Sequence, residues 1–150
     1  MDTVSNLSSH TGYLMRMVSN AVSQDFARKV AERGVTVAEW SFMRALFDDA
    51  GMAPTALADR MGMTRGAISK LAERLAAKRL VQRAESETVG RGQILSLTPE
   101  GRDLVPALAR LADGNDAEYF GVLTPDERAT LDRILRTLVD RRGLTTPPVD

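Results

Sequence analysis

Residues 54–98 read PTALADRMGMTRGAISKLAERLAAKRLVQRAESETVGRGQILSLT, and this stretch decides the fold. Pro54 suits the first position of a helix, and Gly62 predicts where that helix ends. Thr64 then caps a second helix, which the spacing of apolar residues extends over 65–79. The pattern therefore predicts a helix-turn-helix.

Two short strands are predicted directly after the second helix, over 80–84 and 93–98. Between them Gly90 and Gly92 bracket Arg91, which is typical of a hairpin tip. A hairpin after a helix-turn-helix forms a winged helix-turn-helix. In such a unit the second helix enters the major groove of DNA.

A long amphipathic helix is predicted before this unit. Apolar residues recur every three or four positions over 7–31, after candidate caps at Asn6, Ser8 and Ser9. Gly34 marks the stop of this helix. The sequence therefore predicts one long N-terminal helix with an apolar stripe.

Capping signals place three further helices. A capping box over 36–39 opens the first, and the pair at 98–99 opens the second by the cap-then-proline rule. Pro106 should bend or loosen that second helix, because proline lacks an N–H and clashes with the preceding turn. A capping box with proline over 124–127 opens the last helix, and the tail 143–150 is expected to fray.

These elements predict a mainly α fold with a small β-wing: a winged helix-turn-helix with long terminal dimerisation helices. We expect a single domain over 1–150, a DNA-binding lobe over 36–98, and dimerisation helices over 1–33 and 99–142.

Apolar stripes at both ends of a small chain need burial, and a closed two-fold dimer is the commonest solution. Packing within the chain is the alternative for any single residue. We assign the homodimer interface to Leu7, Tyr119, Phe120, Leu131, Ile134, Leu135 and Leu138.

The composition limits the classes of function. The chain has 150 residues, no cysteine and one histidine, so disulfides, thiolate metal sites and cysteine redox sensing are excluded, and we expect no metal and no cofactor. No apolar run approaches the roughly 18 residues of a membrane span, and the N-terminus lacks a signal pattern. We expect a cytoplasmic protein that does not contact membranes.

The net charge of zero hides a basic block. Residues 60–102 hold nine Lys/Arg and four Asp/Glu, a net charge of +5, whereas the rest hold eleven and sixteen, a net charge of −5. A local basic block is the footprint of a module that binds double-stranded DNA. A solvated helical surface is the alternative explanation.

The second helix of the pair has an apolar side around Ile68 and a polar outer side. On the outer side, Arg65 and Lys70 can address guanine O6 and N7, and Ser69 can serve any base or a phosphate. Gly66 costs about 1 kcal/mol of helix propensity relative to Ala. Either it lets the backbone approach DNA closely, or its cost is simply tolerated.

Further residues are better placed for phosphates, which position a protein without reading sequence: Thr64, Arg74, Arg60 and Lys78. Arg91, at the hairpin tip, is a candidate probe of the minor groove or of a phosphate. It could equally be a solvated turn residue, and Lys78 could lie over the core.

The runs GMTRGAISKLAERLAAKRLVQR (62–83) and LSLTPEGRDL (95–104), with the order of the helices, resemble the multiple-antibiotic-resistance regulator (MarR) family. The resemblance covers essentially the whole chain. It implies an obligate homodimer that represses transcription from a pseudo-palindromic operator and is often released by small phenolic or other anionic ligands. The wing departs from the family, whose members often carry two Asp-x-Arg pairs there, because this wing has a single arginine, Arg91.

The resemblance also implies an effector site where the first, second and fifth helices meet. A few polar groups in an apolar cleft would suit a small aromatic or anionic effector. The tryptophan and methionines could equally belong to the core, and the histidine to the surface. The assigned residues are His10, Tyr13, Arg16, Met17, Trp40 and Met43.

Two other classes of function compete with DNA binding. An enzyme is disfavoured because a chain without cysteine and with one histidine has few groups for a nucleophile–base pair. A winged helix used only for protein–protein contact is the second alternative, and the basic outer face of 65–78 argues against it.

Overall fold

The structure is a computed structural model that describes residues 3–86 and 92–148. Its helices and strands confirm the predicted fold class, a mainly helical chain with a two-stranded wing. After a 3-10 turn over Leu7–Ser9, the order is α1 (Thr11–Ala31), α2 (Val37–Phe47), α3 (Pro54–Met61), α4 (Arg65–Ala77), β1 (Val81–Glu85), β2 (Gln93–Leu97), α5 (Pro99–Phe120) and α6 (Pro125–Arg142).

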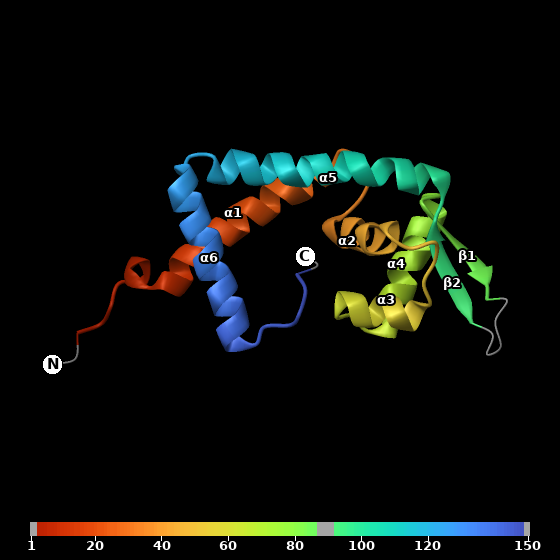
Figure 1. The fold of residues 1–150 in the computed structure, drawn as a ribbon, viewed down its shortest axis with the longest axis horizontal. Coiled ribbons are helices and arrows are strands. Elements are labelled where there is room, and N and C mark those ends of the chain that lie inside the picture. The colour runs from red at the N-terminus through yellow and green to blue at the C-terminus, as the bar shows by residue number, and fades with distance from the viewer. Residues whose placement is uncertain (1–2, 87–91, 149–150) are drawn as a thin grey trace.

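The molecule is elongated, with α5 as a long beam along one edge (Figure 1). The helices α2, α3 and α4 and the wing gather at the N-terminal end of α5, and we call them the winged-helix lobe. At the other end α6 crosses α1, and we call α1, α5 and α6 the helical arm. None of the described helices is long and apolar enough to cross a membrane.

The apolar core belongs almost entirely to the winged-helix lobe and to the first half of α5. No residue of α6 is buried, and the first half of α1 is exposed throughout. The arm therefore lacks a core of its own. The largest fully buried apolar side chains are Phe42, Met43, Leu46, Leu57, Ile68, Leu75, Leu95, Leu108, Val30 and Val105.

The wing is an antiparallel pair in which Val81 faces Leu97 and Glu85 faces Gln93. Met52 extends this sheet from the α2–α3 loop, because its N–H and carbonyl both bond Leu95, each at 2.8 Å. The wing is thereby fixed to the lobe. The tip residue Arg91 lies outside the described residues.

The junction between the wing and α5 is tightly packed. The Thr98 hydroxyl accepts a hydrogen bond from the Gly101 N–H at 3.0 Å and donates one to the Arg79 carbonyl at 2.7 Å. A Cβ on Gly101 would lie 2.1 Å from the carbonyl oxygen of Leu80. Only glycine lets the first turn of α5 approach the end of α4 so closely.

Three local predictions need correction. The caps predicted at residues 6–9 form a 3-10 turn instead, and α1 begins at Thr11. The helix α4 ends at Ala77 rather than at residue 79, because Arg79 adopts a left-handed conformation with φ 61°. The helix α5 runs on through Pro106 without interruption.

The C-terminal tail also differs from its prediction. Fraying was predicted from its two prolines and its place at the end of the chain. Instead Pro147 is half-buried, and both Pro147 and Pro148 lie against the winged-helix lobe. Gly143, with φ 61°, ends α6 and turns the chain toward that lobe.

Candidate DNA-binding surface

The helix α4 presents one buried and one exposed face, as the helical wheel predicts. Thr64 caps it by accepting a hydrogen bond from the Ala67 N–H at 3.1 Å. The buried face holds it against the lobe through Ile68, Leu71, Ala72 and Leu75. The exposed face carries Arg65, Gly66, Ser69 and Lys70.

Arg65 and Lys70 are free to meet a ligand. Within residues 3–86 and 92–148, neither side chain makes a hydrogen bond or an ion pair. Arg83, on β1, directs its guanidinium toward the Ser69 carbonyl at 3.5 Å, so the wing lies beside this face. The exposed face of α4 can therefore donate several hydrogen bonds to a groove without first breaking contacts of its own.

Two other arginines of the basic block form hydrogen bonds within the lobe. Arg60 donates to the Ala45 carbonyl at 2.9 Å and to Asp49 at 2.7 Å. Arg102 donates to the Phe47 carbonyl at 3.0 Å. Both stabilise the carbonyl end of α2, where the helix dipole is negative. The predicted phosphate contact of Arg60 would compete with these bonds.

Glu39 joins α2 to the far end of α4. It is fully buried, and its Oε1 accepts hydrogen bonds from the Thr36 N–H and from Lys78 Nζ, both at 2.9 Å. Arg74 lies 3.6 Å from the same oxygen. Burial raises the pKa of Glu39, but the hydrogen bonds from Lys78 and Thr36 outweigh it, and the pKa lies below its usual value. Lys78 and Arg74 thus hold α4 in place as well as adding charge.

Replacing Glu39 with glutamine should lower the free energy of unfolding near neutral pH by about 1–2 kcal/mol, because the charge that holds half-exposed Lys78 is lost. The folded-state pKa of Glu39 is depressed, so its contribution is present above the unfolded pKa and is lost as the pH falls through the folded pKa. Thermal unfolding of both proteins from about pH 3 to 7 checks this. The gap between their Tm values should shrink in acid, and a constant gap would refute the assigned role.

Gly66 lies on the exposed face with open space around it. A Cβ there would meet nothing nearer than Thr64 Oγ1, at 4.0 Å. Gly66→Ala should therefore raise the free energy of unfolding by about 0.5–1 kcal/mol. It should also weaken DNA binding, because the new methyl group would stand between the backbone and the groove. Denaturant unfolding and a DNA titration measure both effects, and unchanged affinity would mean that the glycine is merely tolerated.

A cleft of about 290 Å³ lies where α1, α2 and α5 meet, at the predicted place of an effector site. Of the six residues assigned to that site, Trp40 lines it. Its lining residues are Val22, Ser23, Phe26, Val37, Trp40, Ser41, Ala112, Asp113, Asn115, Asp116 and Pro148.

The other five assigned residues are not brought to this cleft. Met43 is fully buried in the core of the lobe. His10 turns back along the chain, with Nδ1 3.1 Å from the Asn6 carbonyl oxygen. The remaining three lie on the exposed first half of α1: Tyr13, Arg16 and Met17.

A polar clamp joins α1 to α5 beside the cleft, and no local sequence pattern predicts it. Buried Asn115 donates to the Val22 carbonyl at 3.1 Å and accepts from Lys29 at 2.8 Å. The Tyr119 hydroxyl donates to the Asp25 carboxylate, which lowers the pKa of Asp25 and raises that of Tyr119. The clamp fixes the angle between the two helices.

The arm carries an apolar hollow of about 710 Å³ between α1, the end of α5 and α6. Four residues predicted for a dimer interface line it: Tyr119, Phe120, Leu131 and Leu135. Three more are exposed, Leu7 at 71%, Ile134 at 46% and Leu138 at 43%. The facing wall comes from α1 and includes Leu14, Met17 and Val18.

The chain has relatives among known regulators. The sequence profile of the MarR family matches residues 33–92. A putative transcriptional regulatory protein for the hcr operon of Thauera aromatica is 30% identical over 146 residues, which cover 95% of this chain and 86% of that relative. The chain belongs to the MarR family. Its function class is therefore the predicted one, a DNA-binding transcriptional regulator.

Solved MarR-family structures share the fold. BpsR of Bordetella bronchiseptica, whose DNA binding is regulated by 6-hydroxynicotinic acid, matches with a TM-score of 0.77 and 24% identity over 92% of this chain and 99% of that one. A mutant MarR from E. coli complexed with operator DNA matches with a TM-score of 0.77 and 23% identity, with the same coverage. In this MarR-family chain the assignments of single residues to DNA, effector and dimer remain predictions.

Proposed function

We propose that this MarR-family chain is a homodimeric repressor that reads a pseudo-palindromic operator with α4 and is released by a small ligand. The observation that carries the proposal is the exposed face of α4 beside the wing, where Arg65 and Lys70 have no partner among the described residues. Because its target is DNA, we place its action in the cytoplasm, as a binding protein and not an enzyme.

The helical arm supports the proposed dimer. Its hollow and its exposed leucines, isoleucine and valines form an apolar surface that residues 3–86 and 92–148 leave uncovered. A two-fold partner would bury this surface and would hold two copies of α4 at a set distance from each other. Two recognition helices one helical turn of DNA apart would read two inverted half-sites.

Ile134→Glu tests the dimer. Ile134 is 46% exposed, so a charge there should leave the single chain folded but should oppose burial against a partner. Sedimentation at micromolar concentration should show a dimer for the wild type and monomers for the variant. Arg136→Gln, on the exposed side of α6, changes the charge by the same amount and should stay dimeric. A monomeric wild type would refute the dimer.

The ligand would enter the cleft between α1, α2 and α5. Trp40 and Phe26 offer aromatic faces there, while Asp113 and Asp116 add negative charge to the lining. Asp116 lies 3.9 Å from Arg128, which partly balances its charge, so the lining suits a small aromatic compound, neutral or anionic. Among relatives, the 6-hydroxynicotinic acid that regulates BpsR supports a ring-shaped ligand.

Selection of bound sites from random duplex DNA tests the function. We expect enrichment of one inverted repeat, with half-sites about one helical turn apart. Repeating the selection with neutral and anionic aromatic compounds should identify ligands that abolish enrichment. No enrichment, with a folded dimer, would contradict the proposal and would favour a winged helix that only contacts proteins.

A further inference from the structure

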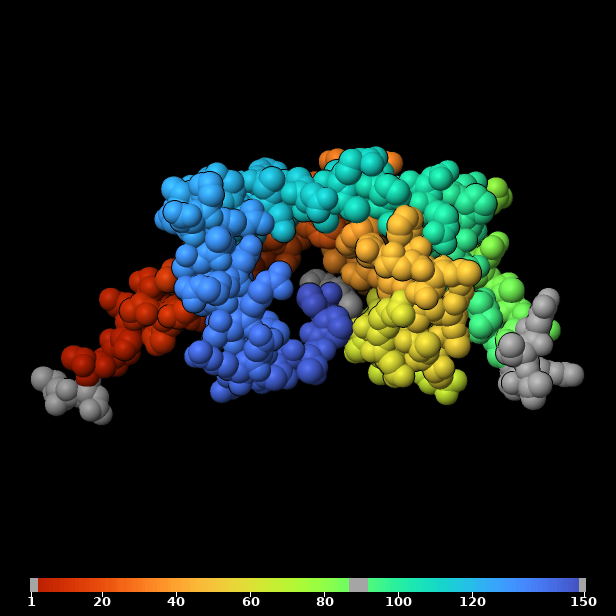
Figure 2. Space-filling model, in the orientation of Figure 1, coloured from red at the N-terminus to blue at the C-terminus, as the bar shows by residue number. Residues whose placement is uncertain are grey.

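The C-terminal tail crosses from the helical arm to the winged-helix lobe. In the space-filling view the chain after α6 spans the gap between the helical arm and the winged-helix lobe and meets α3 (Figure 2). The turn after α6 directs it there, because Gly143 is left-handed and the Leu144 N–H bonds the Val139 carbonyl at 2.9 Å. This pair of features is the usual stop of a helix, and it fixes where the tail starts.

The tail ends on the turn of the helix-turn-helix. Gly62 connects α3 to α4 in a left-handed conformation, with φ 63°. A Cβ on Gly62 would come within 2.9 Å of Pro147 Cδ, so the two residues are in direct contact. Pro147 is half-buried, whereas the residues that lead to it from α6 are exposed. Pro147 therefore touches the lobe directly before the N-terminus of α4.

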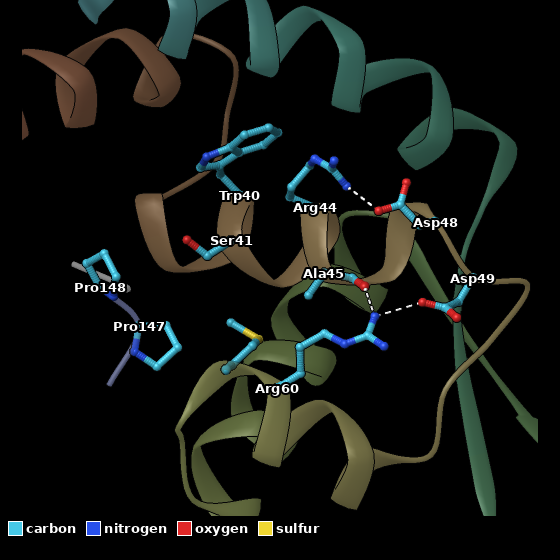
Figure 3. Close-up of a pocket in the computed structure, with 10 residues that line it drawn as sticks. Trp40, Ser41, Arg44, Ala45, Asp48, Asp49, Arg60, Pro147 and Pro148 are labelled. Carbon is cyan, nitrogen blue, oxygen red and sulfur yellow. Dashed lines mark hydrogen bonds and ion pairs between the residues drawn. The ribbon is translucent and has the colours of Figure 1, made fainter. Parts of the chain in front are cut away.

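The second proline of the tail contacts a different part of the lobe. A groove of the lobe is lined by Trp40, Ser41, Arg60 and the two prolines. In Figure 3 Pro147 and Pro148 face Trp40 and Ser41 of α2, and Arg60 lies on the other side of this groove. Pro148, Trp40 and Ser41 also line the cleft between α1, α2 and α5. Pro148 therefore lines both the groove beside Arg60 and the cleft between α1, α2 and α5.

We propose that residues 144–148 form a strap that ties α6 to the turn of the helix-turn-helix, with Pro147 as a positioning residue for α4. Prolines suit this role, because their fixed φ lowers the entropy lost when the tail is ordered. The consequence for DNA rests on the proposed function. Since α6 belongs to the arm that we assign to the dimer, the strap would restrict how far the two α4 helices move apart.

The first test needs no DNA. Trp40 is the single tryptophan of the chain, so its fluorescence reports on one site, the groove that Pro147 and Pro148 also line. Pro147→Gly, and a chain ending at Leu144, should shift the Trp40 emission to the red and increase its quenching by acrylamide. Thr145→Ala, at an exposed tail position, should match the wild type. Unchanged emission and quenching in both altered chains would overturn the strap.

The second test uses operator duplexes whose half-sites are moved apart or together by one and two base pairs. The wild type should bind one spacing best. Without the strap, affinity at that spacing should fall roughly three- to tenfold, because fewer molecules hold the competent arrangement, and the preference between spacings should flatten. An unchanged preference would refute the positioning role. A wild type that binds no duplex would refute the proposed function instead, and the fluorescence would still decide the strap.

Discussion

Gly101→Ala is expected to lower the free energy of unfolding by about 3 kcal/mol, the upper end of the usual cost of forcing extra atoms into a packed site. The new Cβ would lie 2.1 Å from the Leu80 carbonyl oxygen, which is backbone and cannot rotate away. Either α5 must move off the wing or the end of α4 must shift. Denaturant unfolding of both proteins measures the loss.

Gly114→Ala is the matched control. Gly114 lies in the same helix, and a Cβ there would meet nothing within 4 Å. This substitution should stabilise the protein by about 0.5–1 kcal/mol, because alanine loses less entropy on entering a helix. Equal effects of the two substitutions would contradict the close packing of α5 on Leu80.

Arg65→Ala and Lys70→Ala are each expected to weaken binding to the selected operator by about 1–3 kcal/mol, roughly 5- to 150-fold. Both side chains stand on the exposed face of α4 and make no hydrogen bond or ion pair within residues 3–86 and 92–148, so their loss should leave the fold intact. The loss should be much smaller on random DNA, because base contacts carry the sequence preference. Titrations of both duplexes at one salt concentration measure it.

Arg110→Ala, at an exposed position of α5 in the helical arm, removes the same charge away from α4. It should change both affinities little. If Arg65→Ala and Lys70→Ala weakened operator and random DNA equally, the two residues would contact phosphates rather than bases.

Much of the fold could be predicted because its signals are local. Thr36 and Glu39 form the predicted capping box, and Thr64 caps α4 as expected. Each capping residue lies within a few positions of the backbone group to which it bonds, so a short stretch of sequence is enough to predict the cap. The exposed face of α4 follows in the same way from the period of the helix.

The rest depends on contacts between distant residues, for which a single sequence holds no pattern. Lys78 was predicted to meet phosphates or to lie over the core, yet it bonds Glu39 on another helix, 39 positions away. The tail was predicted to fray, because its composition is that of a loose end. Its order comes from Pro147 resting on Gly62, 85 positions earlier in the chain.

Five of the six residues assigned to the effector site lie away from the cleft for a similar reason. The place predicted for the site, between α1, α2 and α5, is a cleft, but periodicity alone does not tell which residues of each helix face it. Met43 lies in the core, and the cleft takes its α1 residues from the second half of that helix, Val22, Ser23 and Phe26. The acidic lining from α5, with Asp113 and Asp116, becomes visible only when the helices are packed together.

The most direct measurement is a titration of the wild-type protein with its selected operator and with a shuffled duplex of the same length and composition, at one physiological salt concentration. A regulator that reads bases through α4 should bind the operator at least about 10³-fold more tightly than the shuffled duplex. Equal affinities for the two duplexes would contradict sequence-specific binding.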